Sequence, residues 1–238
     1  STRAQNSPSR YTLVVSTSCS CAFSNRVLLE RLCKYTGATV SGANQASVKG
    51  PNADCPVNPI VPLTKTKSVV KAGITALSPQ GGTNIHAGAI WGFHVLSPTA
   101  PFTEGAQYTT AMSKIMIIMT DGENTAYQTN NMNNTLYYSY YGYPWNERLG
   151  NTSSTDAQLE TLMNNRLAET CTNAKAAGIR IYTVGLSVNQ TSNPTANTNL
   201  LKNCSSGEGY WFFPTDPSQL TTVFQNIANQ LSQLRLAR

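Results

Sequence analysis

The sequence predicts an α/β fold built on a Rossmann-like, doubly wound and mostly parallel sheet. Two short apolar runs, Ser113–Thr120 (SKIMIIMT) and Ile179–Leu186 (IRIYTVGL), have the length and isoleucine content of buried strands. Segments with helical periodicity stand before, between and after these runs. Strands that alternate with helices pair in parallel through right-handed crossovers, which produces this class of sheet.

The remaining elements follow from hydrophobic spacing and from the residues that end helices. Gly178 supplies the C-terminal stop of a long amphipathic segment that begins at Asp156. The expected elements are helices over Thr66–Leu77, Ile85–Leu96, Asp156–Ala177, Asn199–Asn203 and Pro217–Leu234, and a third strand over Gly209–Phe213.

The chain divides into two parts of different character. Residues 1–60 are rich in Pro, Gly and Asn and are interpreted as an irregular, cysteine-containing insertion or flanking segment, and residues 61–238 as the α/β domain. A Tyr- and Asn-rich stretch at 125–154 predicts a surface insertion. Because Tyr and Trp are enriched at protein-binding surfaces, its aromatic residues are candidate partner contacts, with a self-packed loop as the equal alternative. These residues are Tyr137, Tyr138, Tyr140, Tyr141 and Trp145.

Composition and cysteine use indicate an exported protein that does not bind nucleic acid. Charged residues make up only 12% of the chain, and the net charge of +6 is scattered rather than gathered into a basic stripe. The six cysteines have no histidine at zinc-site spacing, which favours disulfides over reduced buried thiols. We expect the pairs Cys171–Cys204 and Cys33–Cys55, which leaves Cys19 and Cys21 over. The chain opens without Met or a signal peptide, which we interpret as a removed export segment or part of a longer protein.

Two oxygen-bearing side chains mark a candidate metal site. Asp121 directly follows the first buried strand, and Thr83 stands in Gly81-Gly82-Thr83-Asn84 just before a helix. In an open parallel sheet, ligands bind at the carboxyl ends of the strands, and hard cations take oxygen ligands. The alternatives are a turn-forming Asp121 and a helix-capping Thr83.

These motifs carry a resemblance to a known family. GGTNI and SKIMIIMTDGEN resemble two of the three segments of the metal-ion-dependent adhesion site (MIDAS) of von Willebrand factor A (VWA) domains. Over about residues 50–238, the order PNADCP, PLT, GGTNIHAGAIWGFHVLSP, PFTEG, MTDGENT, C-x-x-AK-x-x-GI-x-IYTVG and LRL resembles the C-terminal region of TadG-like Flp pilus-assembly proteins. The resemblance implies a VWA-type domain in which Thr83 and Asp121 belong to the metal site.

The family's first segment, Asp-x-Ser-x-Ser after the first strand, departs from its pattern here. The nearest candidate is Ser16-Thr17-Ser18-Cys19-Ser20 after YTLVV, with Ser16 in the place of the aspartate. Because almost no second strand pattern follows before Pro62, we expect the first strand and helix to lie upstream of this chain. Without that carboxylate, Mg²⁺ or another divalent cation is expected to bind weakly or not at all.

The resemblance implies non-enzymatic, divalent-cation-dependent protein binding in Flp/Tad pilus assembly. The location would be the periplasmic or extracellular face of the bacterial envelope, the partner a pilus-assembly or envelope component, and any membrane anchor upstream. A secreted VWA adhesin for a host or matrix ligand, and a VWA subunit of an ATPase-coupled or metal-inserting complex, are the alternatives. Catalysis is not expected, because His86 and His94 are eight residues apart on one helix and no GxSxG elbow, P-loop or Cys/His dyad is visible.

Overall fold

In the part of the chain that the structure describes, the sheet has three parallel strands in the order β1-β2-β3. The computed structural model describes residues 58–79, 81–109, 112–126, 140–142, 147–150 and 154–236, with side chains to residue 233. β1 (Lys114–Thr120) pairs with β2 (Ile179–Gly185) over its whole length, and β2 pairs with the short β3 (Trp211–Phe212). The predicted α/β class and parallel pairing are confirmed, and these strands place Thr120 at the carboxyl edge of the sheet.

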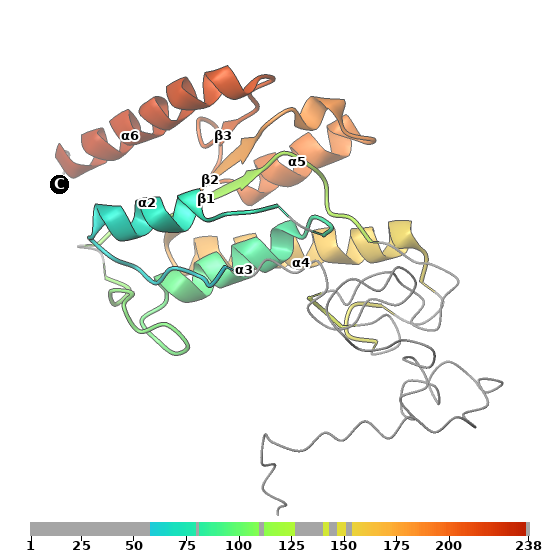
Figure 1. The fold of residues 1–238 in the computed structure, drawn as a ribbon, viewed down its shortest axis with the longest axis horizontal. Helices are drawn as coiled ribbons and strands as arrows, with labels where there is room; N and C mark the ends of the chain where they lie inside the picture. Colours follow the sequence, from blue (N-terminus) through green and yellow to red (C-terminus); the bar gives the residue numbers. More distant parts are fainter. Residues whose placement is uncertain are drawn as a thin grey trace, which may run out of the picture.

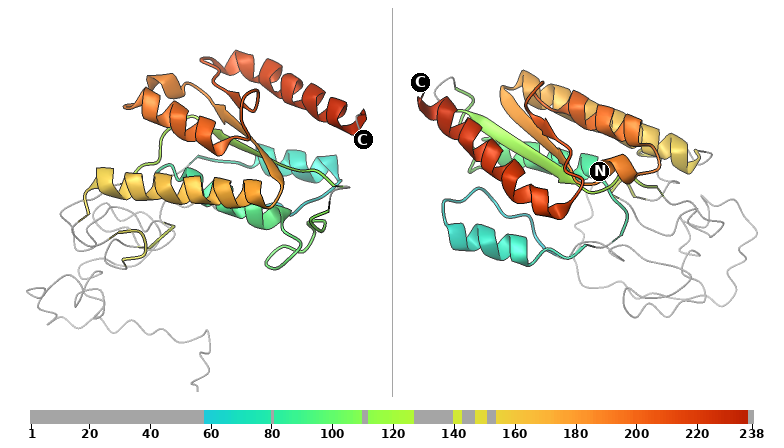
Figure 2. Two further views of the ribbon diagram at one scale, coloured as in Figure 1. Left: turned by 180° about the vertical axis from the view of Figure 1, so that it is seen from behind. Right: turned by 90° about the horizontal axis from the view of Figure 1, so that it is seen from above.

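Helices cover both faces of this sheet (Figures 1 and 2). α3, α4 and α5 lie on one face, where their apolar residues share a core with β1 and β2, and α6 covers the other face over β2 and β3. The helices are α2 (Lys67–Thr75), α3 (Ile85–Leu96), α4 (Asp156–Ala176), α5 (Pro194–Cys204) and α6 (Leu220–Leu236), with short 3₁₀ turns η3 (Val188–Gln190) and η4 (Pro217–Gln219).

The hydrophobic core explains why β2 is mostly apolar, with Arg180 and Thr183 as its polar residues. Ile181 points into the α3–α4 side of the core and is fully buried, whereas Tyr182 and Val184 are buried beneath α6. A strand covered on both faces is expected to be largely apolar, and five of the seven residues of β2, all except Arg180 and Thr183, fit this pattern.

Most predicted helices begin and end within two residues of the observed ones, and local signals account for this. A capping box of Thr155 and Gln158 starts α4, and Gly178, at φ +82°, follows its end. The prediction over Asn199–Asn203 was too short, because α5 begins five residues earlier at Pro194, behind an Asn193 side chain that caps it. The third strand was overestimated, since only Trp211 and Phe212 pair with β2.

A disulfide between Cys171 and Cys204 joins the late part of α4 to the end of α5, with Cα atoms 5.1 Å apart. This confirms the predicted pairing. Both cysteines are buried in the shared core. Cys33 and Cys55 lie outside the described residues, as do Cys19 and Cys21, so their pairing stays a prediction.

No helix in the described ranges combines the length and apolar character that a membrane crossing requires.

Candidate functional site

Asp121 begins the loop that leaves β1 at the carboxyl edge of the sheet. The turn is closed by its neighbour, because Thr120 Oγ1 accepts a hydrogen bond from the Gly122 amide at 3.2 Å and donates one to the Gly122 carbonyl at 3.1 Å. The carboxylate of Asp121 is exposed, and no described group hydrogen-bonds to it. Thr120, and not Asp121, therefore makes the hydrogen bonds that close the turn.

Thr83 is held beside this loop by two hydrogen bonds between its backbone and Thr125. Its amide donates to Thr125 Oγ1 at 2.9 Å, and its carbonyl accepts from the Thr125 amide at 3.1 Å. One residue earlier, Asn124 Oδ1 accepts from the Ile85 amide at 2.7 Å. A methyl group on Gly122 would lie 3.5 Å from Thr83 Oγ1, so the Thr83 hydroxyl and the residue next to Asp121 are neighbours in space.

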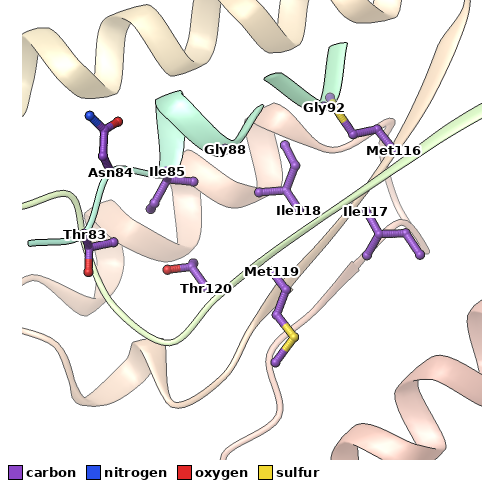
Figure 3. Close-up of a pocket in the computed structure, with 10 residues that line it drawn as sticks. All are labelled: Thr83, Asn84, Ile85, Gly88, Gly92, Met116, Ile117, Ile118, Met119 and Thr120. Atoms are coloured by element: carbon purple, nitrogen blue, oxygen red, sulfur yellow. The ribbon is translucent and has the colours of Figure 1, made fainter. Parts of the chain in front are cut away.

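The capping role proposed as an alternative for Thr83 is filled by another residue. Asn84 is the N-cap of α3, and its Oδ1 accepts from the Ala87 amide at 2.8 Å. Within the described ranges, no hydrogen bond engages the Thr83 hydroxyl. Figure 3 shows Thr83 and Thr120 together at one end of a groove between α3 and β1. The hydroxyl is thus a free oxygen donor at the same sheet edge as Asp121.

Glu123 joins the loop that begins at Asp121 to Ser192 and to Asn197 of α5. Its carboxylate accepts hydrogen bonds from Ser192 Oγ at 2.6 Å and from the buried Asn197 Nδ2 at 2.8 Å. These bonds, that from Ser192 first, hold the pKa of Glu123 below its ordinary value. Glu123 is therefore an ionised anchor of this loop.

Replacing Glu123 by alanine is expected to lower the free energy of unfolding by about 1 to 3 kcal/mol, because the buried amide of Asn197 loses a charged acceptor. Urea unfolding measures the change. Glu208→Ala, in the turn before β3, is the matched control and is expected to change stability by less than about 0.5 kcal/mol. Equal losses of unfolding free energy in both variants would show that Glu123 does not anchor the loop.

One residue of the Tyr-rich insertion packs against α3 beside this site. Tyr141 is only 7% exposed, its ring stacks on His86 with centroids 5.8 Å apart, and Tyr141 Oη and His86 Nδ1 share a hydrogen bond of 2.6 Å. The Arg166 guanidinium lies 5.6 Å from the centre of the Tyr141 ring. Burial, as the largest cause, raises the pKa of Tyr141 to about 12, so it stays a neutral phenol.

The expectation that all five aromatic residues of the insertion form a partner surface therefore needs correction. Tyr141 packs internally, as the self-packed alternative proposed, while Tyr140 is 49% exposed and meets the His86 and Tyr141 rings edge-on. Tyr137, Tyr138 and Trp145 lie outside the described residues.

The His86–Tyr141 contact predicts a loss of stability in mild acid. Burial, and then the nearby Arg166 charge, hold the pKa of His86 below its ordinary value of 6.5, while Glu169 acts in the opposite direction. Since the folded pKa lies below the unfolded one, the unfolded chain binds more protons as pH falls through 6.5. Stability is then fully present above pH 6.5 and is lost below it, down to the folded pKa.

The measurement is urea unfolding at pH 7.5 and pH 5.5. The wild type should unfold at lower urea at pH 5.5, and His86→Gln should lose most of this difference because glutamine does not titrate. His94→Gln, on the same helix, should keep it. An unchanged pH response in His86→Gln would show that His86 is not responsible.

The described residues contain no group of three or more His, Cys, Asp or Glu side chains placed to hold a metal ion. The oxygen donors at the β1 edge are the Thr83 hydroxyl and the Asp121 carboxylate. Both are hard ligands that suit Mg²⁺, but together they contribute a single negative charge, so the affinity they provide is low.

Comparisons with known proteins do not identify a family. No protein-family model matches the chain, and no curated protein matches it. Among solved structures, the pilus adhesin SpaC from Lactobacillus rhamnosus GG is similar, with a TM-score of 0.48 and 20% identity over 71% of this chain. The chain corresponds to 22% of the length of that adhesin. Similarity at this level does not establish a VWA domain, so membership of that family stays a prediction from the sequence motifs.

Proposed function

We propose that this chain binds a partner protein through a divalent cation held by Thr83 and Asp121 at the carboxyl end of β1. One observation carries the proposal. Thr83 and Asp121 are 38 positions apart in the sequence (121 − 83), yet their loops are joined by hydrogen bonds between Thr83 and Thr125. Each loop presents a side-chain oxygen to which no described group hydrogen-bonds. A scaffold that fixes both loops and leaves both oxygens free suits a ligand site better than a structural turn.

The chemistry favours a hard cation and binding rather than catalysis. Mg²⁺ prefers oxygen ligands and keeps several waters, so a hydroxyl and one carboxylate leave coordination positions for water or for an oxygen of the partner. Two other described polar groups near this edge have structural roles, since Glu123 anchors a loop and His86 shares a hydrogen bond with Tyr141. We therefore propose a non-enzymatic function.

The setting we propose is Flp/Tad pilus assembly at the periplasmic or extracellular face of the bacterial envelope. The support is the resemblance of GGTNI, MTDGENT and their neighbours to TadG-like proteins. The Cys171–Cys204 disulfide agrees with an oxidising compartment, where such bonds form and persist. The partner would then be an envelope or pilus-assembly component.

Capture of envelope proteins on the immobilised chain tests this function. Proteins retained in Mg²⁺, released by a chelator and absent from an Asp121→Ala column would support it. The Glu208→Ala column, which keeps the proposed site, should behave as wild type. Retention that is the same in Mg²⁺ and chelator on all three columns would contradict a cation-dependent function.

A further inference from the structure

His86 and Tyr141 form a buried polar contact that the proposed function does not use. His86 lies in the first turn of α3 and is 8% exposed, and Tyr141, 55 positions later, is 7% exposed. Tyr141 Oη and His86 Nδ1 share a hydrogen bond of 2.6 Å, and the planes of the two stacked rings differ by only 10°. This contact joins the Tyr-rich insertion to the start of α3.

The hydrogen bonds of the Tyr141 hydroxyl suit a neutral imidazole. Hydrogen bonding by the Asn84 side chain lowers the pKa of Tyr141, as a donor to the phenol oxygen does, although burial keeps that pKa near 12. With Asn84 as donor, Tyr141 gives its own proton to His86, so Nδ1 is the acceptor and Nε2 carries the imidazole proton. A second proton, on Nδ1, would replace this acceptor by a donor that points at the phenol, and the hydrogen bond would be lost.

The charges around His86 also oppose a second proton. On α4, the Arg166 guanidinium lies 5.6 Å from the centre of the Tyr141 ring and disfavours a cation at His86, whereas Glu169 favours one. The described part of the insertion contributes the rings of Tyr140 and Tyr141, and α3 itself has no Asp, Glu, Lys or Arg. Burial and Arg166 together outweigh Glu169, and this agrees with the lowered pKa of His86.

Proton binding and the docking of Tyr141 therefore oppose each other. Because such coupling is reciprocal, a contact that lowers the proton affinity of His86 is itself weakened by the same factor when His86 is protonated. As pH falls below 6.5, the ratio of released to docked Tyr141 rises by up to about tenfold per pH unit, until the pKa of docked His86 is reached. The exposed Tyr140 ring lies edge-on, 5.3 Å from the Tyr141 ring, so its orientation depends on the same contact.

We propose that His86 and Tyr141 form a proton-operated latch. Neutral His86 holds the Tyr141 ring against α3, and protonated His86 releases it in mild acid while the sheet stays folded. The sheet is expected to stay folded because the seven-residue pairing of β1 with β2 and the Cys171–Cys204 disulfide do not involve His86. The latch is a local change, separate from the global loss of stability that the same titration causes, and it does not depend on a bound cation. Its consequence is that mild acid frees the exposed Tyr140 ring from a fixed orientation.

NMR of the whole 238-residue chain with isotope-labelled histidine and tyrosine follows both sides of the latch in one sample. At pH 7.5, His86 should carry its proton on Nε2, and its ring should show nuclear Overhauser effects to the Tyr141 ring. At pH 5.5 these effects should weaken and a neutral gadolinium chelate should relax the Tyr141 ring protons, with a released-to-docked ratio about ten times that at pH 7.5. His86→Gln should remove this pH response, and His94→Gln, on the same helix, should keep it. The amide of Val184, in the paired part of β2, should stay protected from hydrogen exchange at both pH values.

Three results would overturn the latch. The first is a Tyr141 ring that stays docked at pH 5.5, whether or not His86 has gained a proton. The second is a release that also exposes the Val184 amide, which would show acid unfolding of the whole domain. The third comes from the pKa of His86, which should rise toward 6.5 in Tyr141→Ala once the contact is gone; an unchanged pKa would show that docking and protonation are not coupled. If Tyr141→Ala does not fold, Tyr141→Phe, which removes only the hydroxyl, should still raise the pKa of His86, by a smaller amount.

Discussion

Replacing Asp121 by alanine is expected to abolish cation-dependent partner binding while leaving the fold intact. The carboxylate is exposed and no described group hydrogen-bonds to it, so its loss should change the free energy of unfolding by less than about 0.5 kcal/mol. A carboxylate oxygen on a hard cation, however, cannot be replaced by a methyl group. Thr83→Ala should weaken binding less, because water can take the place of the hydroxyl on the ion.

Thermal melts with and without Mg²⁺ separate the two effects. At a Mg²⁺ concentration ten times the dissociation constant, binding stabilises the folded wild type by about 1.4 kcal/mol. This increment should disappear in Asp121→Ala and shrink in Thr83→Ala, while the melting temperatures in chelator stay close to that of the wild type. Losses of about 1 kcal/mol in chelator would instead favour structural roles for the two residues.

Removing the Cys171–Cys204 disulfide is expected to produce the largest loss of stability. The bond closes a loop of 33 residues, for which the chain-entropy relation gives about 3 to 4 kcal/mol. The double variant Cys171→Ala/Cys204→Ala is preferable to serine, because both positions are buried and a hydroxyl there would add its own cost. Urea unfolding measures the change, and peptide mapping under non-reducing conditions confirms the bond in the wild type.

The matched control is Cys33→Ala/Cys55→Ala, which leaves the Cys171–Cys204 disulfide in place. Reduction by dithiothreitol should therefore still lower the free energy of unfolding of this variant. The Cys171→Ala/Cys204→Ala variant should lose most of that sensitivity. A loss below about 1 kcal/mol in the latter would mean that the bond contributes little to the folded state.

Local signals allowed much of the fold to be predicted. α3 was placed at its observed bounds because an asparagine precedes a sharply apolar helical segment. β1 and β2 were placed because short, largely apolar runs are typical of buried strands, although Ile117 and Met119 of β1 are exposed. The start of α5 could also have been predicted, because Asn193-Pro194 is a strong signal for a helix N-terminus that the prediction did not use.

Contacts between distant residues could not be predicted in the same way. The expectation that ligands bind at the carboxyl edge of a parallel sheet was enough to predict that Thr83 and Asp121 lie near each other. It could not predict that Glu123 accepts hydrogen bonds from Ser192 and Asn197, which are 69 and 74 positions away in the sequence. The pairing of His86 with Tyr141 spans 55 positions. No periodicity marks such pairs, because they depend on how loops cross the finished sheet. Sequence reasoning therefore found the candidate metal oxygens and missed the anchor that holds their loop.

Paramagnetic line broadening by Mn²⁺ tests the metal site most directly. If Thr83 and Asp121 hold the cation, small additions of Mn²⁺ should broaden the amide resonances of Thr83 and Gly122 first, and excess Mg²⁺ should restore them. In Asp121→Ala the same resonances should stay sharp. Broadening that begins around other carboxylates, such as Glu208 or Asp216, and is unchanged in Asp121→Ala would contradict a cation site at the carboxyl end of β1.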